Sequence, residues 1–224
     1  KSIVRNREYA QQRELESNKA RVDIMVNSFL SKHPWKDQVA MLDKMRKVTK
    51  QEIVDFANKY LSLNGYAVCY KRQGDNTSVV GIAKPAITPI QMNRDSVSDF
   101  VRRIQNSNPS PIKPVFANPK KELQFFNLRK GVDVILSKNN VNGLFEITYR
   151  FEFGAKHSRT IGLAAEYAQY LSSSKYSLVD FNSKLYELGA GYGLSTSDDN
   201  VYLTIYGLNE EVRPTLALVE EHLR

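Results

Sequence analysis

Apolar residues recur at helical spacing near the start of the chain. Residues 5–31 contain no Gly or Pro, and this spacing predicts one long helix that ends before His33-Pro34. A second helix is expected over residues 36–46, with Trp35 at its start. In Thr49-Lys50-Gln51-Glu52 the hydroxyl and the carboxylate can form a capping box, so a third helix should begin there. We expect these helices to bury their apolar stripes.

An extended, proline-rich region comes next. A strand predicted over residues 66–71 contains Cys69, which should be a small buried hydrophobic residue. Six of the eight prolines then fall between Pro85 and Pro119. Because proline fixes φ and donates no backbone hydrogen bond, this stretch predicts an extended connector. Ser96-Val97-Ser98-Asp99 should begin a short helix whose apolar residues dock the connector.

A period of two replaces the helical period after the connector. Apolar and polar residues alternate over residues 144–153, which predicts a strand with one buried face and one wet face. Another strand is expected over residues 132–137, joined to it as a hairpin across residues 139–143. The remaining expected elements are helices at 160–171 and 178–188, the latter capped by Ser177, strands at 192–197 and 201–207 paired across Asp198-Asp199-Asn200, and a helix from residue 210 onward.

Composition agrees with a folded chain. With 224 residues and 42% hydrophobic content, the chain can form one large domain or two smaller ones. The element order predicts an α+β fold in which an antiparallel sheet packs against helices. No apolar run approaches the ~20 residues that span a bilayer, so no membrane segment is expected. The chain starts with Lys and stops within an expected helix, so we expect it to be an excised segment.

The net charge of +8 is unevenly distributed. Residues 1–75 hold 15 Lys and Arg against 9 Asp and Glu, residues 76–120 hold 6 against 2, and residues 121–224 hold 11 against 13. Along the first expected helix the basic residues are interspersed with Glu8 and Glu14, which is typical of an ordinary solvated surface. We therefore expect neither nucleic acid nor membrane as a partner.

Residues that could carry chemistry are scattered. None of His33, His157 and His222 is four positions from another, the spacing that aims two imidazoles at one zinc ion, and each is expected at the surface. Asp198-Asp199 could bind a cation but is interpreted as a turn. The Gly-rich residues 189–193 come after a helix and precede a strand, so we predict a helix C-cap and a close backbone approach rather than a phosphate cradle. The residues alone indicate no active site.

Three stretches together resemble the insulinase/pitrilysin-like zinc peptidases. FEFGAKHSRTIGLAAEYAQYLSSSKY, from residue 151, is similar to the start of a family domain, with a strand ending in Gly, a loop and a G-L-A helix. KLYELGAGYGLSTSDDNVYLTIYGL is similar to the helix, turn and strand hairpin that come later in the family domain. VTKQEIVDFANKYLSLNGYAVCYKR is similar to the end of a preceding domain. The resemblance covers nearly the whole chain.

The resemblance implies a junction between two homologous α/β domains, because family members join two halves that enclose a chamber for peptides. Residues 1–75 would be the C-terminal part of a preceding peptidase-like domain. Residues 76–120 would be the connector, with its short helix. Residues 121–224 would open a following, non-catalytic domain.

Catalytic domains of the family carry His-x-x-Glu-His on the G-L-A helix, where two His bind zinc and Glu is the general base. The resemblance puts Ala165 at the first His, Ala168 at the Glu and Gln169 at the second His. No catalytic, metal-binding or cofactor-binding residue is therefore expected here, and zinc is expected on another domain of the parent protein. Glu166 is out of phase with the catalytic position. The helix should serve packing alone, through an apolar stripe of Leu163, Tyr167, Tyr170 and Leu171 and a small face of Ala164, Ala165 and Ala168 that allows close approach of a neighbour.

The function implied is that of a non-catalytic segment of a zinc metalloendopeptidase, inactive by itself, which forms chamber wall and substrate-binding surface. One alternative is a wholly inactive paralogue that pairs with an active homologous subunit. Another is a basic nucleic-acid-binding module unrelated to peptidases. Expected partners are other domains of the same polypeptide, peptide substrate and, in the first alternative, the active subunit. A bacterial periplasmic location is expected by analogy with exported family members.

Overall fold

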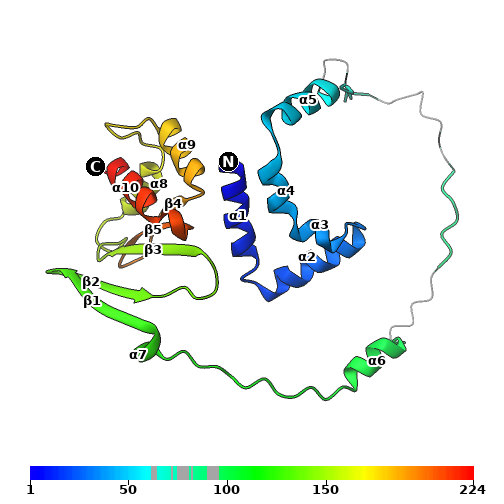
Figure 1. Ribbon diagram of the computed structural model, residues 1–224, viewed down its shortest axis with the longest axis horizontal. Helices are drawn as coiled ribbons and strands as arrows, with labels where there is room; N and C mark the ends of the chain where they lie inside the picture. Colours follow the sequence, from blue (N-terminus) through cyan, green and yellow to red (C-terminus); the bar gives the residue numbers. More distant parts are fainter. Residues whose placement is uncertain (62–64, 72, 75–80, 82, 90–95) are drawn as a thin grey trace.

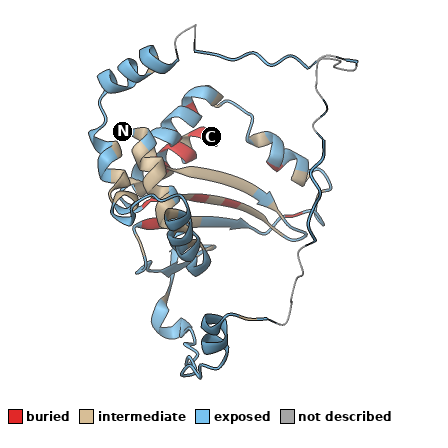
Figure 2. Cartoon of the chain, turned by 90° about the vertical axis from the view of Figure 1, so that its right-hand side faces the viewer, coloured by how far each residue is buried: buried red, intermediate tan, exposed pale blue. Residues whose placement is uncertain are grey.

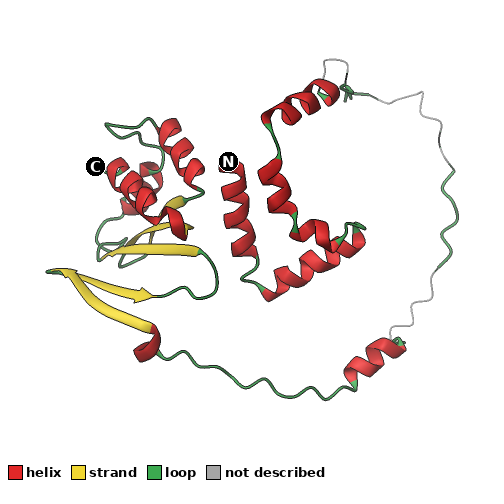
Figure 3. Ribbon diagram, in the orientation of Figure 1, coloured by secondary structure: helices red, strands yellow, loops and turns green. Residues whose placement is uncertain are grey.

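The chain is an α+β protein, as the sequence predicts, with helices and two separate antiparallel sheets (Figures 1 and 3). The computed structural model describes residues 1–61, 65–71, 73, 74, 81, 83–89 and 96–224. Within these ranges no helix has the length and apolar character needed to cross a bilayer. Both termini of the chain lie near the three-stranded sheet (Figure 1).

Five helices make up the start of the chain: α1 (Ser2–Glu14), α2 (Asn18–Leu30), α3 (Trp35–Val39), α4 (Met41–Lys47) and α5 (Lys50–Tyr60). The single helix expected over residues 5–31 is wrong, because the Ser17 hydroxyl accepts from Ala20 N at 3.3 Å and starts a new helix. The helix expected over residues 36–46 is likewise divided at Ala40. The capping box is confirmed: Thr49 N donates to Glu52 Oε2 at 2.7 Å, and Glu52 N donates to Thr49 Oγ1 at 3.2 Å.

The apolar stripes of these helices are exposed, contrary to the prediction. Helices α2 and α5 contain no buried residue, and Phe29 and Phe56 are 83% and 58% exposed. Residues 66–71 form no strand, and Cys69 is exposed rather than buried. A strand needs a neighbour to take up its backbone hydrogen bonds, and no strand of the described chain lies beside this segment.

The described residues of the proline-rich connector form neither helix nor strand outside short helices, as the prolines predict. Residues 83–89 and 107–118 lie in neither a helix nor a strand, and residue 106 is in a turn. The short helix α6 (Asp99–Gln105) begins where predicted, capped by Ser98 Oγ, which accepts from Val101 N at 3.3 Å. Its apolar residues are exposed, Phe100 by 62%, so the expected docking of the connector is not found among the described residues.

Strand pairing differs from the prediction in the second half. After the one-turn helix α7 (Pro119–Glu122), an unpredicted strand β1 (Leu123–Arg129) pairs with β2 (Val132–Ser137) across a tight turn at Gly131, whose φ is +80°. The expected hairpin between β2 and the next strand, β3 (Leu144–Phe151), is therefore wrong. Its Asn-rich loop closes on itself instead, with Asn139 Nδ2 donating to Leu144 O at 2.9 Å.

The C-terminal unit, residues 144–222, is built on a three-stranded sheet in the order β3-β5-β4. The hairpin of β4 (Gly191–Thr196) and β5 (Val201–Leu208) is confirmed, including its turn, where Ser197 N donates to Asn200 O at 2.8 Å. Helices α9 (Leu178–Leu188) and α10 (Val212–His222), the latter after a 3-10 turn (Asn209–Glu211), pack on one face. The core consists of Phe181, Leu185, Leu203, Ile205, Leu218 and Val219 (Figure 2).

Helix α1 packs against the C-terminal unit as well as against α4. The ring of Tyr9 stacks on Tyr206, with 5.6 Å between centroids. Asn6 Nδ2 donates to Tyr186 O at 2.6 Å, and Arg5 Nη1 donates to Glu187 O at 2.8 Å. These carbonyls belong to the last turn of α9, where the usual donor four residues on is missing, although Tyr186 O also accepts from Gly189 N at 3.2 Å.

Candidate functional site

Helix α8 (Ile161–Ala168) is the helix on which the family resemblance places the zinc motif. It is shorter than the predicted 160–171, because the chain leaves the helix at Gln169, the C-cap residue. The helix lies against β4, where Gly162 faces the Thr196 side chain: a Cβ at that glycine would lie 3.4 Å from Thr196 Oγ1. The helix thus sits beside the sheet, and in chain order it stands between the strand β3 and the Ser177-capped helix α9.

The three motif positions carry no zinc chemistry. Ala165 is buried, with 8% of its surface exposed, and Ala168 is half-buried. Both side chains are methyl groups without lone pairs. Gln169 is exposed and lies outside the helix, and its neutral amide cannot supply the anionic or imidazole ligands that zinc prefers. Glu166 is exposed, and it belongs to no metal-binding group of the described residues.

The packing of α8 agrees with the prediction for the small face in part, and differs from it for the apolar stripe. The apolar stripe Leu163, Tyr167, Tyr170 and Leu171 is exposed, by 70%, 63%, 72% and 45%. On the small face, Ala165 is buried and Ala168 is half-buried, while Ala164 is exposed. Within the described chain, the large side chains of this helix are left to solvent.

Metal-binding residues are not gathered anywhere in the described part of the chain: no group of three or more His, Cys, Asp or Glu could hold an ion there. His33 is exposed at the α2–α3 corner. His157 is exposed too, and its Nδ1 accepts from Gly154 N at 3.1 Å. His222, predicted at the surface, is buried, because it lies with Thr215, Leu218 and Val219 on the inner stripe of α10. That i, i+3, i+4, i+7 pattern is the signal that could have found it.

The acidic turn at Asp198-Asp199 binds the loop that follows β3. Lys156 Nζ lies 3.1 Å from Asp199 Oδ1, and this hydrogen bond and charge raise the pKa of the lysine above its ordinary value. Lys156 N also donates to Asp198 O at 2.9 Å. The turn therefore holds the loop after β3 against the β4–β5 hairpin.

The Gly-rich turn after α9 is a packing feature, as predicted. Gly189 ends the helix with φ +64°, a left-handed conformation that glycine adopts without strain. A Cβ at Gly191 would lie 2.7 Å from the ring of Tyr206, so only hydrogen fits there. No phosphate-binding arrangement results at these described residues, since side chains of β5 and α1 fill the space beside Gly191 and Gly189.

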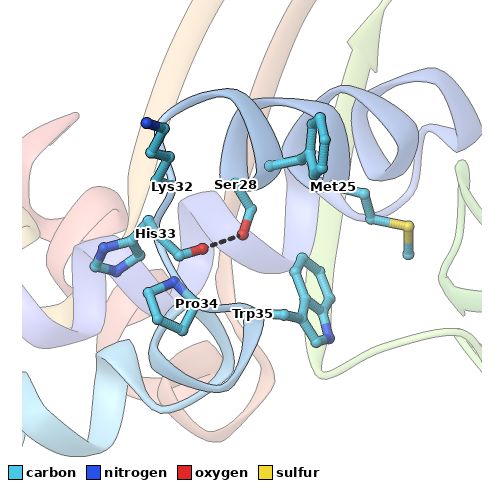
Figure 4. Close-up of a pocket in the computed structure, with 7 residues that line it drawn as sticks. Met25, Ser28, Lys32, His33, Pro34 and Trp35 are labelled. Carbon is cyan, nitrogen blue, oxygen red and sulfur yellow. Dashed lines mark hydrogen bonds between the residues drawn. The ribbon is translucent and has the colours of Figure 1, made fainter.

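A separate hollow of about 600 Å³ lies at the α2–α3 corner (Figure 4). It is wide open and mainly apolar, between Met25, Phe29 and Trp35, with His33 and Pro34 at its other side. Ser28 Oγ donates to His33 O at 2.6 Å beneath it. The hollow lies on the helices α2 and α3, and none of the motif positions on α8 lines it.

The comparisons with known proteins are limited to structure. No family model and no curated protein matches the chain. Three solved proteins are similar in fold: a peptidase M16 inactive domain from Pseudomonas fluorescens (17% identity, TM-score 0.40), a protease from Helicobacter pylori (19%, 0.39) and the periplasmic protease PqqL from Escherichia coli (16%, 0.41). The matches cover 44%, 45% and 81% of this chain.

These structural matches cover only part of this chain and only part of each of the three proteins. The chain spans 25%, 25% and 18% of the three proteins, in the same order. At TM-scores under 0.5 they add no weight to any residue assignment. The function of the chain must therefore be inferred from the residues of α8 and from the surfaces around it.

Proposed function

We propose that the chain is a non-catalytic segment of an insulinase-like zinc metalloendopeptidase, in which it forms part of the chamber wall and of the peptide-binding surface. The observation that carries the proposal is helix α8. It stands between β3 and α9 in the chain, as the family's motif helix does, yet Ala165, Ala168 and Gln169 occupy the motif positions. Zinc peptide hydrolysis needs imidazole ligands and a carboxylate base at these places.

The donor set of α8 does not fit a zinc ion. Two methyl groups and one neutral amide offer a single weak ligand, whereas catalytic zinc sites use three protein ligands. No hydrolytic step can therefore be assigned to this helix. Zinc of the parent protein would be held by another domain, and this chain would contribute surface.

The exposed apolar surfaces support partners within a larger assembly. Besides the stripe on α8, the β1–β2 ribbon exposes apolar side chains on both faces, among them Phe125 by 66%, Phe126 by 46% and Ile135 by 64%. A two-stranded ribbon is at best marginally stable alone in water. Contiguous apolar surface of this kind marks contact with other protein. Other domains of the same polypeptide are the partners we propose, and a bacterial periplasmic location belongs to the same proposal by family analogy.

Metal analysis of the purified chain tests the motif assignment. We expect no stoichiometric, tightly bound zinc and no peptide cleavage that a chelator abolishes. The double variant Ala165→Ser/Ala168→Ser, which adds no zinc ligand of the required kind, should behave as the unchanged chain does. Tight binding of one zinc per chain would contradict the assignment at α8.

Measurements on the polypeptide that contains this chain test the rest. We expect that polypeptide to hold zinc and to cleave extended peptides, and Ala168→Ser to leave kcat/KM within about twofold of the unchanged enzyme, because no transition-state contact is lost. Zinc-free polypeptide that becomes active only with a homologous subunit would favour the inactive-paralogue alternative. Salt-sensitive binding of nucleic acid by the chain, without any peptidase activity, would favour the basic binding module instead.

A further inference from the structure

His222 lies in the core of the C-terminal unit, where the proposed function makes no use of it. Its side chain is 7% exposed. The ring stacks face to face on the fully buried Phe181 of α9, with 3.6 Å between centroids and 8° between planes. Tyr192 of β4 lies edge-on to it, at 6.3 Å. The imidazole therefore joins α10, α9 and β4 as if it were an apolar aromatic ring.

The nitrogen atoms of this ring favour the neutral form. Nδ1 is buried, and no hydrogen-bond partner for it exists among the described residues. A neutral imidazole can leave Nδ1 without a proton, whereas the cation carries N–H on both nitrogens. Protonation would thus place a buried donor, and a charge, opposite no acceptor.

The charged groups on and beside the elements that pack around His222 interact with other residues. On α9, Asp180 accepts from the Ser177 hydroxyl at 2.7 Å, and Lys184 lies over the Tyr176 ring. Lys175, just before α9, pairs with Glu221 of α10 at 3.5 Å. Tyr192 of β4 is neutral, since burial raises its pKa.

Two features oppose these effects. The C-terminal end of α10 and the face of the Phe181 ring both attract a cation. Burial nevertheless lowers the pKa of His222 below its ordinary value of 6.5, and no neighbouring charge contributes to the shift.

Helix α9 also holds α1, so the stack has consequences beyond the core. The last turn of α9 presents Tyr186 O to Asn6 and Glu187 O to Arg5. The side chains of Phe181 and Leu185 anchor the same helix on the sheet. A displacement of α9 would therefore reach the contact with α1.

We propose that the stack of His222 on Phe181 is a pH-sensitive lock between α10 and α9, closed while His222 is neutral and opened by its protonation. The unfolded chain takes up the proton first as the pH falls, because the pKa of His222 is lower in the folded state. The contribution to stability is complete above about pH 6.5 and is lost as the pH falls through the folded value. Each unit of difference corresponds to about a tenfold change in the unfolding equilibrium.

Denaturant unfolding of the full chain at about pH 7.5 and about pH 5.0, followed by circular dichroism, tests the lock. His222→Phe keeps a stacking ring and removes the titrating group, so the rise in its unfolding equilibrium constant from about pH 7.5 to about pH 5.0 should be at least about threefold smaller than in the unchanged chain. His33→Phe is the matched control, because His33 is exposed. This variant should lose as much stability between the two pH values as the unchanged chain does. Equal losses in all three proteins would overturn the proposal.

A second measurement is independent of any variant. In an NMR titration of the unchanged chain, the His222 ring protons should have a midpoint below 6.5, the ordinary value of a histidine. Hydrogen exchange of the amides in the last turn of α9 should accelerate over the same pH range. A His222 midpoint at or above 6.5 would overturn the proposal, even if His222→Phe failed to fold.

Discussion

Helices α5 and α9 have the same kind of sequence pattern and different surroundings. Each has 11 residues, a hydroxyl cap at its start and an apolar stripe. Helix α9 buries Phe181 and Leu185 against β5 and α10, whereas α5 leaves Phe56 58% and Ile53 58% exposed. An apolar stripe thus predicts the helix and an apolar face on it. Whether that face is buried depends on whether another element supplies a complementary surface.

The largest expected difference in stability is between removing the aromatic ring of Phe181 in α9 and removing that of Phe56 in α5. Phe181→Ala should lower the free energy of unfolding of the C-terminal unit by about 3–5 kcal/mol, through lost burial and a cavity. Phe56→Ala should change that unfolding by less than about 0.5 kcal/mol, because the side chain is exposed. Denaturant titrations of both variants make the comparison. An equal loss for Phe56→Ala would show that α5 is packed in solution.

The next effect concerns two glycines of the same strand. Gly191→Ala should cost about 1–3 kcal/mol, because its Cβ would lie 2.7 Å from the Tyr206 ring and must displace it. Gly193→Ala is the control, with no atom within 4 Å of the added Cβ, and should be close to neutral or stabilising. Thermal unfolding monitored by circular dichroism separates them. Equal Tm values would mean that Tyr206 yields freely.

The contact between the two regions should be weaker than the core. Asn6→Ala removes the hydrogen bond to Tyr186 O and should cost about 0.5–1.5 kcal/mol. Asn18→Ala, at an exposed position on α2, should cost less. Hydrogen exchange at α1 provides the measurement, with faster exchange expected for Asn6→Ala alone. Unchanged protection of α1 would show that the Tyr9–Tyr206 stack suffices to hold it.

The smallest effect is local to α5. The backbone N–H and hydroxyl of Thr49 bind the Glu52 carboxylate and lower its pKa below its ordinary value of 4.5. The capping box is therefore intact above about pH 4.5, and it is lost as the pH falls through the lower folded value. Thr49→Ala should reduce α5 helicity at neutral pH, whereas Thr49→Ser should retain it. Residue-resolved NMR shifts of α5 check both variants, and equal helicity in the two would exclude a role for the cap.

Local signals in the sequence found most elements with side-chain caps or tight turns. The caps at Thr49, Ser98 and Ser177 and the C-cap at Gly189 all lie where predicted. Ser17 carries a similar signal for the start of α2, but the unbroken helical period hid it. The assignment of Ala165, Ala168 and Gln169 to the motif positions stays a prediction, since it depends on the family resemblance.

The amino-acid sequence by itself determined most of the helices, the β4–β5 hairpin and the lack of imidazole and carboxylate groups at Ala165, Ala168 and Gln169. These features depend on residues within a few positions of one another, whose hydrogen bonds close locally. Only the tertiary structure decided that β1 pairs with β2, that the apolar stripe of α8 is exposed, and that His222 is buried. Burial and strand pairing join residues far apart in the chain, and an amphipathic pattern does not specify which distant surface will cover it.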